Sequence, residues 1–126
     1  MAQENSPNHL VNTFFNIYED KSTDEAFDYI FSTNNLISKS DVGLIKSKIS
    51  KYRNALGDYY GKEMFVTQKI NETIEVQSYI LKYENQPLRF IFTFYKPNKG
   101  WKIQNFKISD TFIEEVEEAS ITLKYK

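Results

Sequence analysis

The sequence contains no cysteine, and this absence removes several classes of protein from consideration. Disulfide-stabilised scaffolds, thiol nucleophiles and zinc sites with cysteine ligands all require that residue. Histidine is almost as scarce, because His9 is the only one and no Asp or Glu stands at metal-ligand spacing from it. A surface residue at the start of a helix is a better interpretation of His9 than a general base or a metal ligand. We expect neither a metal nor a cofactor.

The chain also lacks an excess of charge of either sign. Its 16 basic and 17 acidic residues give a formal net charge of -1. A general nucleic-acid binder presents a basic surface, so we expect no nucleic acid as a partner. No apolar run approaches the roughly 20 residues that a helix needs to cross a bilayer, and we expect no membrane span.

The first residues carry no signal peptide. Ala2-Gln3 before a polar stretch nevertheless resembles what remains after a leader is cleaved. Export with a removed leader and a cytoplasmic location are therefore equal alternatives.

Aromatic residues are abundant, with ten Phe and nine Tyr among 126 residues. This composition argues against disorder and favours a core built on large rings. A chain of this length forms one domain and folds without a disulfide or a metal. We expect a single domain, 1–126, with a core from about 6 to 112. For the C-terminal extension, 113–126, an acidic helix with an added strand and a frayed tail are equal alternatives.

The clearest local pattern is a hairpin from Leu88 to Ser109. The first strand places its aromatic residues on one parity, which is the period of a half-buried strand: Phe90, Phe92 and Phe94. Pro97 ends this strand because it has no N–H to donate, and Gly100 supplies the positive φ of a short turn. The apolar pattern then changes parity between Ile103 and Phe106, which predicts a bulge or a strand covered on both faces.

Three helices are predicted before the sheet. Ser6 followed by Pro7 is a typical helix start, and Ser22 with Glu25 forms a capping box. Gly57 is the natural end of the third helix. The predicted helices run over about 7–20, 23–31, and from 38 or 40 to 56.

From Asp58 onward the apolar period changes to two. One strand is predicted over Phe65–Ile70, with a start as early as Tyr59, and the next over Thr73–Tyr83. Together with the hairpin they form four consecutive antiparallel strands. Helices followed by strands indicate an α+β domain, with the three helices packed on one face of a curved meander of about four strands.

The order of elements, and the last hairpin with Gly100-Trp101-Lys102-Ile103 followed by Phe106 and Ile108, resemble the nuclear-transport-factor-like superfamily. The resemblance covers roughly 9–112. This cone-shaped fold is shared by ketosteroid isomerases, scytalone dehydratase and many bacterial domains. It implies a pocket between sheet and helices and a homodimer through the sheet. It transfers no active site, because no local motif matches the Asp, Tyr and His groups of those enzymes.

Three polar residues interrupt otherwise apolar strand patterns: Gln68, Ser78 and Asn105. If they share the concave face, they would orient a small apolar molecule in a mostly apolar pocket. The alternative is that they point to water. The strand register decides between the two, because a slip of one residue turns every side chain to the other face.

A second candidate set consists of Tyr79, Tyr83 and Tyr95 with Arg89. These residues would form an exposed aromatic patch for a partner or a dimer interface. Aromatic pairs across strands explain the same residues as stabilisers of the sheet, and this alternative is favoured.

The leading hypothesis is a non-catalytic domain that binds a small molecule or a partner. A small isomerase- or dehydratase-like enzyme is the first alternative, with Asp28, Asp58, Glu63 and Tyr60 as the available catalytic groups. An interaction module that uses the tyrosine-rich sheet face is the second. The sequence has no glycine-rich phosphate loop and no nucleophile elbow.

Overall fold

Three helices precede four strands, in the order that the sequence predicts. The computed structural model describes residues 6–109, apart from the side chain of Asn54. The predicted extension, 113–126, and Ala2-Gln3 lie outside these residues. The elements are α1 (Pro7–Asp20), α2 (Thr23–Phe31), α3 (Lys39–Leu56), β1 (Tyr59–Lys69), β2 (Ile74–Tyr83), β3 (Pro87–Tyr95) and β4 (Lys102–Ser109).

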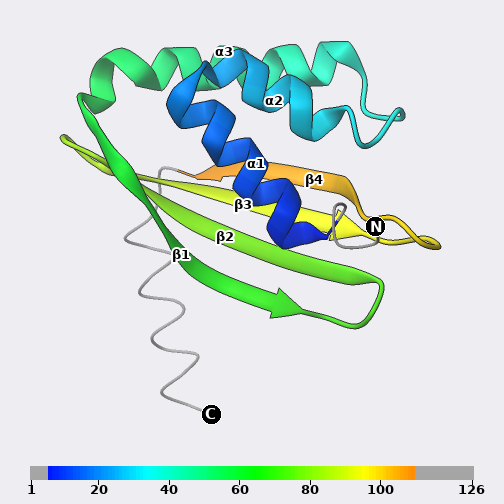
Figure 1. Ribbon diagram of the computed structural model, residues 1–126. Coiled ribbons are helices and arrows are strands. Elements are labelled where there is room, and N and C mark those ends of the chain that lie inside the picture. Colours follow the sequence, from blue (N-terminus) through cyan, green and yellow to red (C-terminus); the bar gives the residue numbers. More distant parts are fainter. Residues whose placement is uncertain (1–5, 110–126) are drawn as a thin grey trace.

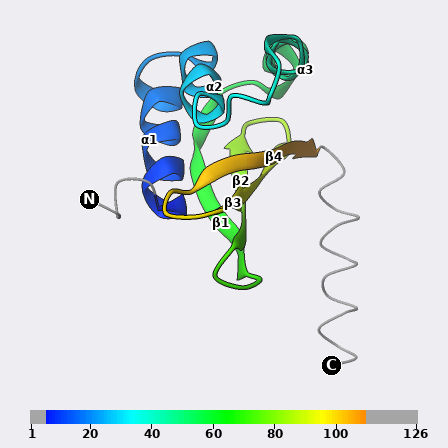
Figure 2. The same cartoon turned by 90° about the vertical axis from the view of Figure 1, so that its right-hand side faces the viewer.

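The strands form one antiparallel sheet in the order β1-β2-β3-β4, and the helices lie on one side of it (Figures 1 and 2). This confirms the α+β class and the meander. β1 begins at Tyr59, the earlier of the two predicted starts. None of the described helices is long and apolar enough to cross a membrane.

Serine side chains begin all three helices. The hydroxyl oxygens of Ser6, Ser22 and Ser38 each accept a hydrogen bond from the backbone N–H three residues later, at 3.1 or 3.2 Å. Pro7 stands in the first turn of α1, where its missing N–H costs nothing. α3 therefore starts after Ser38 rather than Ser40. Each such cap contributes about 1 kcal/mol to stability.

Gly57 and Gly100 differ in backbone conformation. Gly57 ends α3 with φ of 80°, and a Cβ at this position would lie 3.1 Å from the Cβ of Glu84. Gly100 was predicted to take a positive φ, but only Gly57 and Gly61 do so among the described residues. The connection between β3 and β4 spans 96–101, and a loop of this length does not need the left-handed residues of a two-residue hairpin.

Aromatic rings fill the space between helices and sheet. Phe14 of α1 packs edge-on against Phe92 of β3 with ring centroids 5.2 Å apart. Phe27 of α2 packs in the same way against Phe106 of β4 at 5.1 Å. Such edge-to-face pairs add to the stabilisation from burial. The fully buried rings are Phe14, Phe15, Phe27, Phe90, Phe92 and Phe94.

A bulge in β4 keeps its apolar residues on the helix side. Asn105 lies opposite Thr93, whereas Ile103 lies opposite Phe94, so Gln104 is an extra residue in the ladder. Ile103 is therefore buried together with Phe106, although the two positions are three apart and would face opposite sides in a regular strand. This confirms the bulge that the parity change predicts.

Candidate functional site

The three polar strand residues do share one face of the sheet. Gln68 lies opposite Val76, Val76 opposite Thr93, and Thr93 opposite Asn105, so a single row crosses all four strands. Ser78 follows on the same face, two residues along β2 from Val76. This face points away from the helices, because Thr93 alternates with the buried rings of β3. The structure therefore does not direct these residues toward the space between helices and sheet.

Among these three residues, Ser78 alone is buried, with 1% of its surface exposed. Its hydroxyl oxygen accepts a hydrogen bond from the guanidinium of Arg89 at 3.3 Å. The same guanidinium lies over the ring of Phe65, 4.9 Å from its centroid. Arg89 thus covers Ser78, while Gln68 and Asn105 are exposed to solvent.

The tyrosines of the second set lie on both sides of the sheet and do not form one exposed patch. Tyr79 is 7% exposed and packs against Phe15 of α1. Tyr83 also faces α1, while Tyr95 and Arg89 lie on the helix-free face. The reason is strand parity: the two β2 tyrosines share the helix side with Leu81, which is fully buried.

A cluster of tyrosines joins α1 to β1 and β2. The hydroxyls of Tyr18 and Tyr83 lie 2.6 Å apart, and the hydroxyl of Tyr59 donates to the Glu19 carboxylate at 2.7 Å. Burial raises the pKa of Tyr18, Tyr59 and Tyr83 above the ordinary value for tyrosine. The three hydroxyls are therefore protonated at neutral pH, and with the Glu19 carboxylate they link α1 to β1 and β2.

A second polar network fixes the N-terminal end of α1 to β2. Gln77 is fully buried, and its amide donates to Asn8 at 2.8 Å and to the Glu75 carboxylate at 2.6 Å. Its carbonyl accepts from the hydroxyl of Tyr79 at 2.8 Å. Burial raises the pKa of Tyr79 to about 12. Because these polar groups form hydrogen bonds with one another, the network stabilises the packing of α1 on β2.

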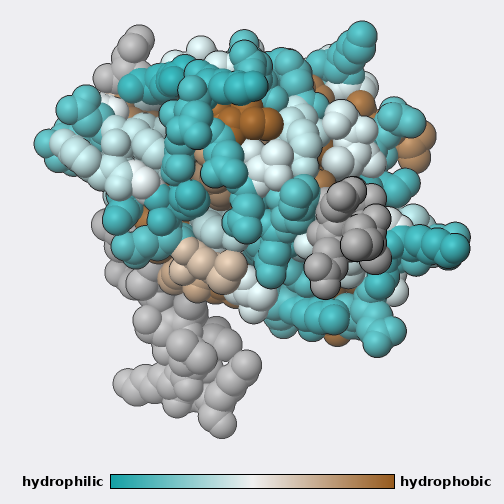
Figure 3. Space-filling view, in the orientation of Figure 1, coloured by the Kyte–Doolittle hydropathy of each residue, from teal (hydrophilic) through white to brown (hydrophobic). Residues whose placement is uncertain are grey.

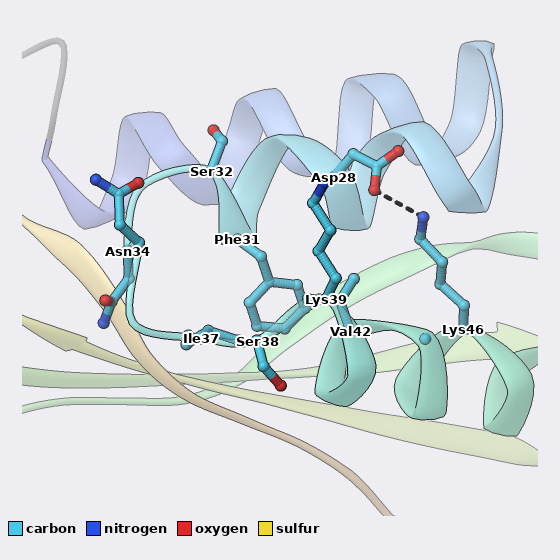
Figure 4. A pocket seen from close by; sticks show the side chains of 11 residues that line it. Asp28, Phe31, Ser32, Asn34, Ile37, Ser38, Lys39, Val42 and Lys46 are labelled. Atoms are coloured by element: carbon cyan, nitrogen blue, oxygen red, sulfur yellow. Dashed lines mark hydrogen bonds and ion pairs between the residues drawn. The ribbon is translucent and has the colours of Figure 1, made fainter.

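A pocket of about 530 Å³ lies between the end of α2 and the first turns of α3 (Figure 4). Its apolar lining comes from Phe31, Ile37 and Val42, and Gly43 leaves one side free of side chain. The polar lining surrounds these residues and consists of Asp28, Ser32, Asn34, Asn35, Ser38, Lys39 and Lys46.

Hydrogen bonds to β4 fix the loop that forms the pocket. The buried side chain of Asn34 donates to the carbonyl of Ile103 at 2.8 Å and accepts from the N–H of Leu36 at 3.0 Å. The N–H of Ile103 in turn donates to the hydroxyl of Thr33 at 3.0 Å. One backbone position of β4 therefore holds two adjacent residues, Thr33 and Asn34, at the start of the loop that leaves α2.

Of the four groups considered for catalysis, only Asp28 lines the pocket. It forms an ion pair of 2.7 Å with Lys46 of α3 (Figure 4). Asp58, Tyr60 and Glu63 lie beyond the other end of α3, which at 18 residues is about 27 Å long. The structure does not bring these four groups together.

His9 is exposed in the first turn of α1. Within residues 6–109, no group of three or more His, Asp or Glu side chains could hold a metal ion.

Gly43 is the residue at the pocket that sequence reasoning missed. A Cβ built on it meets no atom within 4 Å, and its φ is not positive. Neither packing nor backbone conformation therefore requires glycine here, although glycine inside a helix costs about 1 kcal/mol relative to alanine. An isolated glycine within a helical pattern was the available signal.

Exposed leucines stand beside the pocket on a surface that is otherwise mainly hydrophilic. Leu36 in the loop is 92% exposed and Leu44 of α3 is 68% exposed. Figure 3 shows hydrophilic residues over most of the helical side, with separate hydrophobic spots between them. Leu36 stands in sequence between two residues that line the pocket, and Leu44 follows Gly43, which also lines it.

Comparison of the chain with known protein families, with curated proteins and with solved structures finds no match.

Proposed function

We propose that the protein is a non-catalytic binding domain of the nuclear-transport-factor-like type, which takes a small, partly apolar molecule between α2 and α3. The observation that carries the proposal is the pocket itself. Its volume of about 530 Å³ lies within the usual range for small-molecule sites. Its lining combines three apolar residues with seven polar or charged ones, which suits a ligand that is itself part apolar and part polar.

We place the ligand in the pocket of the helical layer rather than between helices and sheet. Aromatic rings occupy the space between helices and sheet, where the resemblance implies a cavity. The pocket between α2 and α3 is instead held open by a loop that is hydrogen-bonded to β4.

We favour binding over catalysis because of the state of Asp28. Its carboxylate is 64% exposed and already paired with Lys46. A general acid or base works best when burial brings its pKa close to neutral pH. The polar groups of the pocket are better suited to orienting a ligand.

Gly43 offers a direct test. A Gly43→Leu variant would extend a side chain into the pocket, and Gly43→Ala is the matched control because it adds only a methyl group in open space. A compound that binds the native state at a hundred times its Kd stabilises it by about 2.7 kcal/mol. In a thermal-shift screen of small metabolites, a hit should stabilise the wild type and Gly43→Ala but not Gly43→Leu. Equal stabilisation of all three proteins would contradict the proposal.

A second candidate function is self-association through the helix-free face of the sheet. This face is partly apolar, with Val76 and Ile91 half-buried and Val66 and Ile70 exposed. It also carries Arg89, a residue type that is enriched at interfaces, and Lys107 opposite Ile91. We propose a second copy of the chain as the partner. Light scattering should then show a dimer that Ile91→Lys converts to a monomer, and a monomeric wild type would contradict it.

A further inference from the structure

The hydrogen bonds that the pocket makes internally leave it rich in donors. Asn34 uses its amide and its carbonyl to hold the loop. The hydroxyl of Ser32 donates to a backbone carbonyl of α2 at 2.6 Å. Ser38 accepts from the first turn of α3, so its hydroxyl proton remains available to a ligand. What is left for a ligand therefore includes the hydroxyl proton of Ser38 and the N–H groups of the two lysines, beside the acceptor oxygens of Ser32 and Asp28.

The charges at the pocket also favour an anionic ligand. Two lysines and one aspartate line it, which gives a net charge of +1. Lys46 uses one of its three N–H groups for Asp28. Lys39 makes no ion pair with any residue between 6 and 109. It also begins α3, where the helix dipole disfavours a cation. An anion in the pocket would relieve this unfavourable placement.

The apolar lining limits what else the ligand contains. Phe31, Ile37 and Val42 line the pocket together with the lysines (Figure 4). A small inorganic anion would leave these apolar side chains in contact with water, whereas an apolar body would cover them. A dianion such as a phosphate monoester is also disfavoured, because a net charge of +1 does not balance it and the Asp28 carboxylate repels it.

We propose that the pocket selects a small monocarboxylate with an apolar body, such as an aromatic or branched aliphatic acid. This inference rests on the proposed function and goes beyond it by naming the ligand class. The carboxylate accepts from Lys39 and from the remaining N–H groups of Lys46, and the apolar body lies against Phe31 and Val42.

The test uses benzoate, with benzamide and benzylamine as its neutral and cationic analogues. The amide signals of Val42 and Gly43 report binding in titrations followed by NMR. Benzoate should bind about five to ten times more tightly than benzamide, since a charge-assisted hydrogen bond replaces a neutral one. Benzylamine should bind more weakly than either. Added salt should reduce the preference, because the lysines are partly exposed.

Two variants separate the anion preference from binding itself. Lys39→Gln should bring benzoate and benzamide to similar affinities, while Lys48→Gln, an exposed lysine of α3 that does not line the pocket, should leave the ratio unchanged. Gly43→Leu should abolish the shifts for all probes.

The outcomes distinguish the two claims. Equal binding of benzoate and benzamide, lost in Gly43→Leu, would overturn the inference and leave the proposed function standing. Absence of shifts at Val42 and Gly43 with every probe at millimolar concentration would overturn both. A preference for benzoate that survives Lys39→Gln would overturn the assignment of the anion preference to Lys39.

Discussion

The hydrogen bond between Tyr18 and Tyr83 should contribute more to stability than its chemistry alone suggests. The two oxygens lie 2.6 Å apart, and the bond ties the end of α1 to the end of β2 across 65 residues of sequence. Tyr18 is 8% exposed, so its hydroxyl has little access to water if the partner is removed. The Tyr83→Phe variant removes that partner and keeps the ring, whose centroid lies 5.1 Å from that of Tyr59.

The expected magnitude follows from these contacts. A neutral hydrogen bond contributes about 1 kcal/mol net, and a buried hydroxyl left without a partner costs roughly 1–3 kcal/mol. We therefore expect Tyr83→Phe to lower the free energy of unfolding by about 2 kcal/mol. The double variant Tyr18→Phe/Tyr83→Phe leaves no orphaned hydroxyl. It should be destabilised by less than the sum of the two single variants, with a coupling of about 1–2 kcal/mol.

Urea unfolding followed by circular dichroism measures all three variants against the wild type. Tyr60→Phe is the matched control, because Tyr60 is 59% exposed and its loss of a hydroxyl should change stability by less than about 0.5 kcal/mol. If the two single effects add without coupling, or if Tyr83→Phe matches the Tyr60→Phe control, the link between α1 and β2 does not exist as described.

Four further outcomes are expected. Burial and the adjacent Tyr83 raise the pKa of Tyr18, so above pH 10 the unfolded chain loses this proton before the folded chain does. The contribution of Tyr18 to stability is therefore complete below pH 10 and is lost as the pH rises further. Denaturant titrations at alkaline pH should show the free energy of unfolding falling by about 1.4 kcal/mol per pH unit more in the wild type than in Tyr18→Phe. Asn34→Ala removes the side chain that holds the loop to β4, so it should lower the free energy of unfolding by about 2 kcal/mol and increase hydrogen exchange at Leu36. Unchanged exchange at Leu36 would contradict the anchoring role of Asn34. Phe92→Ala empties the middle of the ring cluster and should cost about 3–5 kcal/mol in the same unfolding assay, where a cost below 1 kcal/mol would contradict the close packing. Gly43→Ala should instead stabilise the protein by about 1 kcal/mol, and a loss of stability would show that the space beside it is not open.

Local signals explain why the fold could be predicted from the sequence. Ser6, Ser22 and Ser38 cap their helices through the next few residues alone, and the alternation of β3 needs no knowledge of its neighbours. The parity change before Phe106 likewise predicts the bulge in β4. Each of these features depends on residues close together in the chain.

The candidate site depends on contacts between distant residues, which the sequence does not specify. Gln68, Ser78 and Asn105 were expected to orient a ligand if they faced the helices, but the register directs their row to the other face. Asn34 lies a few residues beyond the predicted end of the second helix, yet it binds β4 through Ile103, 69 residues away. No periodicity reveals such a contact.

The same limit applies to the tyrosines. Tyr79 and Tyr83 appeared to belong with Tyr95, because all three lie in adjacent aromatic strands. The structure separates them by face, and it joins Tyr83 to Tyr18 of the first helix instead. The side of the sheet to which a strand residue points depends on how the strands pair, so composition alone could not assign these residues to the core or to the surface.

The most direct test of the proposed ligand site is a crystal structure of the full chain grown with a compound that stabilises it in the thermal-shift screen. We expect density between α2 and α3 that contacts Phe31 and Val42, with Lys39 turned toward the ligand. Density only on the helix-free face of the sheet, or a pocket closed by its own side chains while the compound binds elsewhere, would contradict it.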